Sequence, residues 1–418
     1  MFKERREQYL KFADNHSMTL LFSGHALIRT NDEAFPFSVD RNFYYLTGID
    51  QENVTLLMIK GDVDTKSFLF VDENDPVKVL WTGKTLEKDE AAKIAELDIK
   101  DILYNQTLKE TITALLSTSR RALYGELKTA YFDLERLSVD AMDKTAHQFS
   151  RQLQEGFPYM QIKPCQRMLA KMRMVKSEDE IHVIKQAVAI TKDGLNRIMD
   201  HLKPDMLEYE IEAEYNYVLN KSHTTPSFKT IAASGKHATV LHYVDNDGII
   251  NDGELVLFDL GVEKDFYCSD VTRVFPASGT FTDRQKAIYE VVLEANKKTI
   301  AWVKAGITFK EFNDFGKQIL IDGAKKLGLI KEDSDITKYY YHSLGHYLGL
   351  DVHDVGMYHE PMPEGAVLTV EPGLYIAEEG IGIRIEDDIV LTKDGAINLT
   401  KEIVKEVKDI EALIKKSL

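Results

Sequence analysis

Short apolar runs separated by turn residues dominate the first third of the chain. Runs of this length, bounded by turn residues, predict buried strands, and three of them lie at residues 18–22, 54–59 and 67–71. Residues 86–97 have helical composition, and residues 121–124 return to a strand-like pattern. This alternation of strands and helices predicts a smaller α/β domain, with bounds at residues 1–165.

A longer, helical periodicity begins near residue 170. Ser177, followed three positions later by Glu180, forms a capping box, and apolar residues then recur at helical spacing. Thr282 and Gln285 repeat the box ahead of a second long helix. These signals predict a separate second domain at residues 170–418.

Composition narrows the function classes. The 418 residues are 44% hydrophobic and 29% charged, as in a globular protein, and the net charge of -16 argues against a nucleic-acid binder. Two cysteines cannot build a disulfide framework. We see neither a signal peptide nor an apolar run long enough for a membrane span, so we expect a cytoplasmic protein with no membrane partner.

The second domain contains two apolar runs that each carry one carboxylate. Residues 255–262 form a strand-like run around Asp259, and Asp270 lies in a second run at 267–275. Gly261 and the polar residues after it permit a turn between the runs. The two runs are therefore predicted to pair as a hairpin that brings both Asp side chains together.

The same arrangement recurs further along the chain. Residues 367–376 carry Glu371, residues 382–392 carry Glu386, and a turn is possible at Glu379-Gly380. An unpaired carboxylate buried in an apolar run is very costly, so each acid needs a cation or several hydrogen-bond donors. Four such acids aimed at one place indicate a metal site.

Three histidines lie between the two acidic pairs, in the segment at residues 341–355. They are His342, His346 and His353. A single acid in a strand is more often a structural residue, and a single histidine is more often a hydrogen-bonded core side chain. The joint occurrence of two acid-bearing hairpins and a glycine-flanked His346 favours metal binding over these structural interpretations.

These segments resemble the aminopeptidase P and prolidase group of pita-bread metallopeptidases, and most closely the Xaa-Pro aminopeptidases. The matching segments are LFDLG, SDVTRVFP, HSLGHYLGLDVHDVG, TVEPGLYI, GIRIEDDIV, RMVKSEDEI and VLHY in the second domain, and VDRNFYYLTG and WTG in the first. The resemblance implies an α/β N-terminal domain of the creatinase type followed by an α+β pita-bread catalytic domain. The sequence departs from the family pattern at Ser343 and at Lys236-His237-Ala238, which bears on fine specificity.

The resemblance also implies a dinuclear metal site. Its ligands would be Asp259, Asp270, His346, Glu371 and Glu386, with Asp270 and Glu386 bridging the two ions. Four carboxylates and one imidazole form a hard, oxygen-rich set, which suits Mn²⁺, while Zn²⁺, Co²⁺ and Fe²⁺ stay open. The expected cofactor is therefore a pair of divalent metal ions.

The chemistry implied by this family is hydrolysis of a peptide bond. Two metals about 3.5–4 Å apart can share a water and lower its pKa, and the resulting hydroxide attacks the peptide carbonyl. We assign Glu371 to proton transfer, His353 to stabilisation of the developing negative charge, and His242 to the substrate backbone. Without the resemblance, His242 would as readily be a core residue of a sheet.

Proline recognition needs its own residues, because a proline nitrogen carries no hydrogen. In the family pattern, the positions of His342 and Arg384 lie beside the pocket for proline. The structural alternative for Arg384 is an ion pair with an acid, and for His342 a supporting role behind the ligands. The expected substrate is a peptide with proline second, from which the first residue is released.

Two alternative functions stay open at this stage. A prolidase has the same metals but cleaves only Xaa-Pro dipeptides, and sequence alone does not show whether the pocket is open. A non-catalytic pita-bread scaffold would be expected to have a broken ligand set, whereas all five ligand positions are filled here. The resemblance further implies a homodimer, or a higher homo-oligomer, in which Trp81 reaches a neighbouring subunit.

Overall fold

The computed structural model describes residues 1–62, 64–117, 119 and 123–417. The chain divides into two compact units, Met1–Met172 and Arg173–Leu418. Each unit contains its own hydrophobic core, built from residues of that unit alone.

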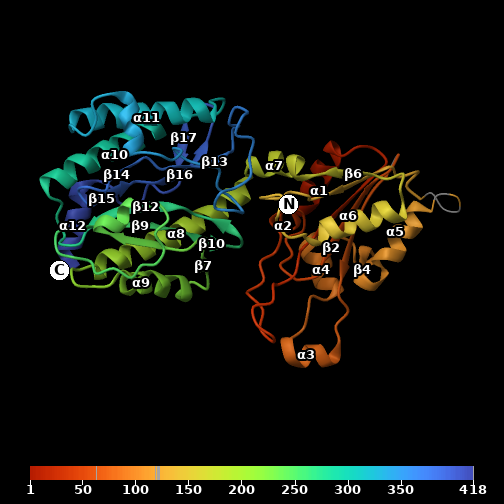
Figure 1. Cartoon of the computed structure of the whole chain (residues 1–418). Helices are drawn as coiled ribbons and strands as arrows, with labels where there is room; N and C mark the ends of the chain where they lie inside the picture. The colour runs from red at the N-terminus through yellow and green to blue at the C-terminus, as the bar shows by residue number, and fades with distance from the viewer. Residues whose placement is uncertain (63, 118, 120–122, 418) are drawn as a thin grey trace. The chain divides into compact units, whose positions relative to one another are not determined.

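The first unit is built on a six-stranded mixed sheet (Figure 1). Its strands, in the order β4-β3-β2-β1-β5-β6, have the bounds β1 Ser17–Phe22, β2 Thr55–Lys60, β3 Thr65–Val71, β4 Ile102–Tyr104, β5 Thr129–Phe132 and β6 Gln161–Pro164. β2 pairs antiparallel with β1 and β3, and the remaining pairs are parallel. The strands predicted at 18–22, 54–59 and 67–71 are confirmed as β1 to β3, whereas the prediction at 121–124 falls partly outside the described residues.

Helices cover both faces of this sheet because the side chains of each strand alternate between them. On β1, Met18 and Leu20 join the core formed with α5 and α6, while Thr19 on the opposite face is bonded to Tyr9 of α1. The helices are α1 Phe2–Phe12, α2 Arg41–Thr47, α3 Pro76–Thr82, α4 Lys88–Ala95, α5 Leu108–Leu116, α6 Thr145–Gly156 and α7 Gln166–Met174, which crosses the boundary of the units. The predicted helix at 86–97 corresponds to α4.

The second unit contains several short sheets that enclose the acidic residues. Its strands are β7 Thr225–Pro226, β8 Ile231–Ser234, β9 Leu255–Leu260, β10 Val262–Lys264, β11 Tyr267–Cys268, β12 Val271–Pro276, β13 Val367–Val370, β14 Gly373–Ile376, β15 Ile381–Arg384, β16 Asp387–Leu391 and β17 Ala396–Asn398. They form the sheets β12-β9-β8, β11-β10-β7, β13-β16-β17 and β14-β15.

Helices lie outside these sheets, with α8 and α9 on one side and α10 and α11 on the other (Figure 1). Their bounds are α8 Glu178–His201, α9 Glu208–Lys221, α10 Asp283–Trp302 and α11 Phe309–Lys326, and α12 Val407–Ser417 ends the unit. The capping boxes predicted at Ser177 and Thr282 are both present, each with its side-chain oxygen accepting a backbone N–H three residues ahead.

Both predicted hairpins are present. The first is confirmed, since β9 and β12 pair antiparallel with Asp259 opposite Thr272. The second is confirmed as well, since β14 and β15 pair across the turn at Glu379-Gly380 and β13 and β16 continue the same antiparallel register, with a division of the ladder between the two pairs. Pro372, which has no N–H for a ladder hydrogen bond, stands at this division. Glu371 and Glu386 occupy the interruption, between strands rather than within them.

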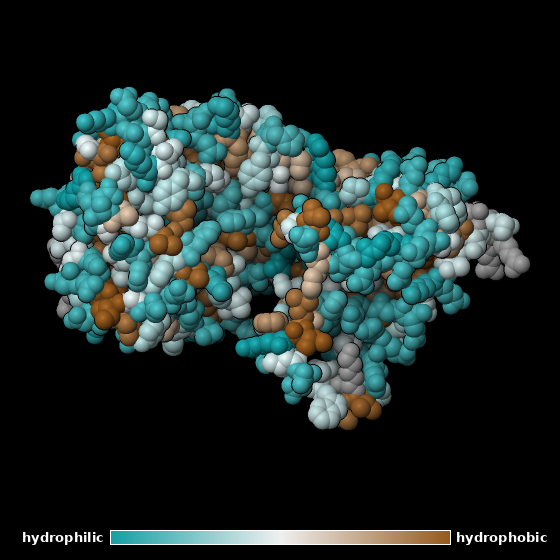
Figure 2. All heavy atoms as spheres, viewed as in Figure 1, coloured by the Kyte–Doolittle hydropathy of each residue, from teal (hydrophilic) through white to brown (hydrophobic). Residues whose placement is uncertain are grey.

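Across the described residues, every helix is too short or too polar to cross a bilayer. The face shown in Figure 2 is covered mainly by hydrophilic side chains, with small and scattered hydrophobic groups between them.

A fully buried arginine on β12 ties the acid-bearing strands to the end of the chain. Arg273 donates to the carboxylate of Asp387 at 2.8 Å and to the carbonyl oxygen of Glu386 at 2.6 Å. Further bonds go to the carbonyl oxygens of Thr272, Ile403 and Val404. Asp387 also pairs with Lys405, so that two cations compensate one buried carboxylate.

Replacing Arg273 by methionine is expected to lower the free energy of unfolding by about 3 kcal/mol, because a buried carboxylate loses one partner. The value lies at the lower end for a broken buried pair because Lys405 stays with Asp387. Arg284→Met is the control, since Arg284 forms a half-exposed pair with Glu379, and should cost less than about 1 kcal/mol. Chemical denaturation monitored by circular dichroism measures both, and equal midpoints for the two variants would contradict the account.

Candidate metal centre

The second unit contains a cavity of about 630 Å³ where the acid-bearing strands meet. The structure brings all nine sequence-predicted site residues to its wall: His242, Asp259, Asp270, His342, His346, His353, Glu371, Arg384 and Glu386. The rest of the lining is largely apolar and includes Phe228, Ile231, Leu241, Phe309 and Val352. A cavity with one polar cluster in an apolar wall is typical of a small-molecule or peptide site.

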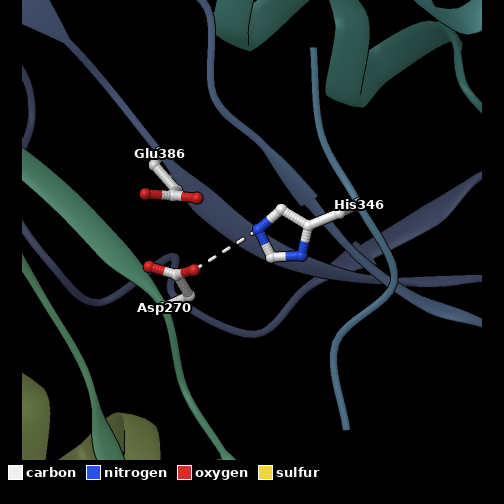
Figure 3. A group of neighbouring side chains, drawn as sticks. All are labelled: Asp270, His346 and Glu386. Carbon is white, nitrogen blue, oxygen red and sulfur yellow. Dashed lines mark ion pairs between the residues drawn. The ribbon is translucent and has the colours of Figure 1, made fainter. Parts of the chain in front are cut away.

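Three predicted ligands converge at the centre of this cavity. Asp270 directly precedes β12, Glu386 lies between β15 and β16, and His346 lies in the segment before β13. One ligand atom of each lies within 4.8 Å of the others, and Figure 3 shows both carboxylates facing the imidazole. His346 Nε2 is 3.4 Å from Asp270 Oδ2 and 3.6 Å from Glu371 Oε1.

The tautomer of His346 leaves a lone pair directed at these acids. Its Nδ1 lies 2.9 Å from the carbonyl oxygen of Tyr347, which can only accept, so Nδ1 carries the proton. Burial, together with the neighbouring His353, lowers the pKa of His346 to about 4. At neutral pH the ring is therefore uncharged, and its free nitrogen is available as a metal ligand.

The carboxylates of the cluster resist ionisation in the absence of a cation. Burial, and then repulsion from Glu386, Asp259 and other acids, raises the pKa of Asp270 well above its usual value. Burial and repulsion from Glu371 do the same for Glu386. Burial is also the largest cause that raises the pKa of Glu371, to about 7. A nearby positive charge would restore the ionised form of all three.

Two carboxylate oxygens provide a direct test of whether metal ions fit this site. Asp259 Oδ1 and Asp270 Oδ1 are both buried and have no hydrogen-bond partner in the described part of the chain. Buried polar atoms are normally satisfied, so orphaned oxygens in an acidic cluster are explained by an ion that completes them. The oxygen-rich donor set with one imidazole therefore fits divalent metal ions.

Arg384, predicted to contact substrate, is held by three groups of the protein itself. Its guanidinium pairs with Asp259, donates to Thr272 Oγ1 at 3.0 Å and donates to the Tyr375 hydroxyl at 2.9 Å. The structural alternative, an ion pair with an acid, is thus present. Since Arg384 also lines the cavity, this pairing fixes its position there and leaves its role in substrate binding a prediction.

The other histidines surround the same centre. His342 Nε2 accepts from the Tyr375 hydroxyl at 2.9 Å, and its Nδ1 lies 3.7 Å from Glu371 Oε2. The ring of His353 packs edge-on against that of His346 with centroids 4.3 Å apart. Burial is the main cause that lowers the pKa of His342 and of His353. The nearby His242 lowers both further, because a positive charge on its ring would repel theirs.

Sequence reasoning missed three residues that support this centre. Thr272 donates to Glu386 at 2.6 Å, Tyr375 links Arg384 to His342, and Asp388 accepts the backbone N–H of Asp270 at 3.2 Å. All three lie inside the segments that resemble the metallopeptidases. Only their place in those segments could have identified them, because polar side chains in and beside strands are common and show no distinctive spacing.

Comparison with known proteins agrees with this geometry. Residues 182–393 match metallopeptidase family M24, and residues 2–124 match the aminopeptidase P N-terminal domain. The chain is 35% identical to the Xaa-Pro aminopeptidase of Haemophilus influenzae, over 99% of this chain and 96% of that protein. The Xaa-Pro aminopeptidase of Escherichia coli is 34% identical, over 99% and 97%.

Solved structures extend the similarity to the fold. A Bacillus anthracis protein described as a candidate aminopeptidase P superposes with a TM-score of 0.96 at 42% identity, covering 100% of this chain and 98% of that one. The E. coli aminopeptidase P with the inhibitor Pro-Leu gives 0.90 at 31% identity, with the same coverage. The predicted fold class, an α/β N-terminal domain and an α+β pita-bread catalytic domain, is confirmed. The chain belongs to metallopeptidase family M24 and carries an N-terminal domain of the aminopeptidase P type.

Proposed function

We propose that this protein is a metal-dependent Xaa-Pro aminopeptidase, which releases the first residue of a peptide whose second residue is proline. The observation that carries the proposal is the cavity itself, in which four acids and the free nitrogen of His346 converge. Relatives of nearly the same length bear the name Xaa-Pro aminopeptidase, which favours this specificity among the members of the family.

The proposed cofactor is a pair of divalent ions, held by Asp259, Asp270, His346, Glu371 and Glu386 with Asp270 and Glu386 as bridges. Mn²⁺ is the proposed metal, because oxygen ligands outnumber nitrogen four to one. A zinc-substituted form of the E. coli aminopeptidase P is known, so the fold accepts more than one metal in that relative. When bound, the ions would activate a water for attack and polarise the scissile carbonyl.

The chain's own residues would then handle the proton and the developing charge. Glu371 reaches the centre of the cavity, 3.6 Å from His346, and is proposed to accept the proton of the attacking water and pass it to the leaving nitrogen. His353, edge-on to His346, is proposed to stabilise the oxygen on which negative charge develops. His242 is proposed to hold the peptide backbone beside it.

Proline recognition is proposed for the wall formed by His342 and Arg384. Arg384 donates to the Tyr375 hydroxyl, which in turn donates to His342, so the three side chains form one connected unit. A connected hydrogen-bonded wall of this kind holds its shape and can read a rigid ring without needing an N–H from the substrate.

A prolidase is the alternative with the same metals. A dipeptidase must hold the free carboxylate of the proline, which calls for a basic group left over near the pocket. Arg384 is already committed to Asp259, Thr272 and Tyr375, but Lys229 also lines the cavity, so it is the names of the full-length relatives that favour the aminopeptidase. The complete ligand set likewise favours an enzyme over a non-catalytic scaffold.

The remaining proposals concern organisation. We propose functional domains at residues 1–165 and 170–418, a homodimer or higher homo-oligomer, and a cytoplasmic location. The match of residues 2–124 to the aminopeptidase P N-terminal domain, and the division of the chain after Met172, support a separate N-terminal domain. Trp81 is 85% exposed, which is compatible with a side chain that contacts a second subunit.

Product analysis tests the proposed specificity. The Mn²⁺-loaded protein is incubated with Arg-Pro-Pro and, separately, with Gly-Pro, and the products are separated by chromatography. We expect free arginine from the tripeptide and little hydrolysis of the dipeptide, because the site reads the proline ring and not a free carboxylate. Rapid hydrolysis of Gly-Pro with an intact tripeptide would make the protein a prolidase instead.

The stability of the metal-free protein relative to that of metal-free Glu371→Gln should fall as the pH rises from 5 to 8. This comparison cancels the opposite contribution of His342 and His346, whose pKa is lowered to about 4. A carboxyl whose pKa is raised on folding stabilises the protein while it is protonated and loses this contribution as the pH passes its folded value. For Glu371, a rise from 4.5 to about 7 corresponds to about 3 kcal/mol. Thermal unfolding of the metal-free wild type and of metal-free Glu371→Gln measures this difference. A difference in melting temperature between the two proteins that does not fall over this range would contradict the assignment.

A further inference from the structure

A buried glutamate outside the metal cluster anchors the segment that carries His242. Glu208 is the first residue of α9, and its side chain is completely buried. Every group that donates to it comes from residues 234–248, which include the short 3₁₀ helix Gly235–Thr239 and the VLHY segment. One carboxylate thus gathers a loop of about 15 residues.

The two oxygens of Glu208 receive donors from both ends of this segment. Oε1 accepts the backbone N–H and the hydroxyl of Ser234 at 2.6 and 2.7 Å, and His237 Nδ1 at 3.0 Å. Oε2 accepts the Tyr243 hydroxyl at 2.7 Å and the backbone N–H of Gly248 at 2.8 Å. The segment is closed into a loop at this point.

These bonds make the buried carboxylate a stable anion. Although burial acts to raise it, the pKa of Glu208 is lowered by the bonds from Ser234, Tyr243 and Gly248. The N-terminal position on α9 adds a favourable helix dipole. Hydrogen bonds to a charged acceptor are about twice as strong as neutral ones. The bonds to Glu208 therefore stabilise the loop more than the same number of neutral hydrogen bonds would.

The opposite side of the loop faces the metal cavity. The cavity is lined on this side by Leu241, His242 and Val244. Within the described part of the chain, no hydrogen bond holds the imidazole of His242. The position of this ring therefore depends on its neighbours in the backbone. Tyr243, the next residue, is bonded to Glu208 and stacks on His237 with ring centroids 4.3 Å apart.

At the end of the loop, the backbone of Gly248 packs too closely against its neighbours to leave space for a side chain. A Cβ added at Gly248 would lie 2.6 Å from His237 and 2.9 Å from Glu208. A methyl group there would push against the anchor and against the ring that stacks on Tyr243. The close approach of the Gly248 backbone to Glu208 is therefore part of the same construction.

We propose that Glu208 is a positioning residue, which holds His242 in the metal cavity through Tyr243 and His237. This inference rests on the proposed function, because it assigns His242 a contact with the substrate. It assigns Glu208 no contact with substrate or metal, so its effect on the reaction must pass through His242.

A double-mutant cycle tests the coupling. Steady-state kinetics with Arg-Pro-Pro are compared for the wild type, Glu208→Gln, His242→Ala and the double variant, all loaded with Mn²⁺. In Glu208→Gln an amide NH₂ replaces one oxygen and meets groups that are themselves donors. We expect about a ten-fold fall in kcat/KM, divided between kcat and KM as in His242→Ala, and no further fall when His242→Ala is already present.

Three measurements separate positioning from a general loss of structure. Glu210→Gln, in the same turn of α9, caps its own helix and should leave the kinetics unchanged. Metal content should be equal in all variants. Hydrogen exchange in Glu208→Gln should accelerate at residues 234–248 and not elsewhere. If Glu208→Gln does not fold, Tyr243→Phe takes its place in the cycle, since it removes the hydroxyl that bonds Glu208 and Asp247 and keeps the carboxylate of Glu208.

The inference is overturned if the effects of Glu208→Gln and His242→Ala multiply, or if exchange in the loop is unchanged. It is also overturned if Glu208→Gln lowers the activity while His242→Ala does not, since Glu208 would then act through another group. A wild type that is silent on Arg-Pro-Pro would instead overturn the proposed function, and the exchange measurement would still decide whether Glu208 anchors the loop.

Discussion

Repulsion among four carboxylates in one buried cavity is the constraint on which this structure depends. Burial and mutual repulsion raise the pKa of Asp270, Glu371 and Glu386, so that the cluster opposes its own ionisation when no cation is present. His346 cannot compensate, because its own pKa is lowered to about 4. Divalent metal ions, which metallopeptidases of this family use, would supply the missing charge and could use the ligand atoms that the described part of the protein leaves unpaired.

The protein's own cations are placed around this centre rather than in it. Arg273 and Lys405 neutralise Asp387, the acid directly after Glu386, while Arg384 restrains Asp259 through one oxygen and leaves the other unpaired. Asp387, directly beside the proposed ligand Glu386, is therefore satisfied by its own cations. The buried Glu208 acts in the same way at the cavity wall, where charge-assisted bonds give a loop a fixed shape.

The sequence predicted the parts of this arrangement that leave a local pattern. One acid in each apolar run identified Asp259 and Asp270, and both hairpins were correct because each pair of apolar runs has a clear turn between its members. Periodicity does not show where Pro372 interrupts the ladder of the second hairpin. The pairing of Arg384 with Asp259 and the anchor at Glu208 join residues distant in the chain, and no spacing rule reports such contacts. The catalytic and substrate-binding roles of the histidines stay predictions.

The number of metal ions that each chain binds tests the account most directly. The protein would be stripped of metal, dialysed against Mn²⁺ and analysed by inductively coupled plasma mass spectrometry, together with Asp270→Asn, Glu386→Gln and the control Asp265→Asn. The account predicts two ions per chain in the wild type and in the control, and the loss of at least one ion in each of the other variants. A wild type that binds no metal, or bridging-residue variants that retain two ions, would contradict it.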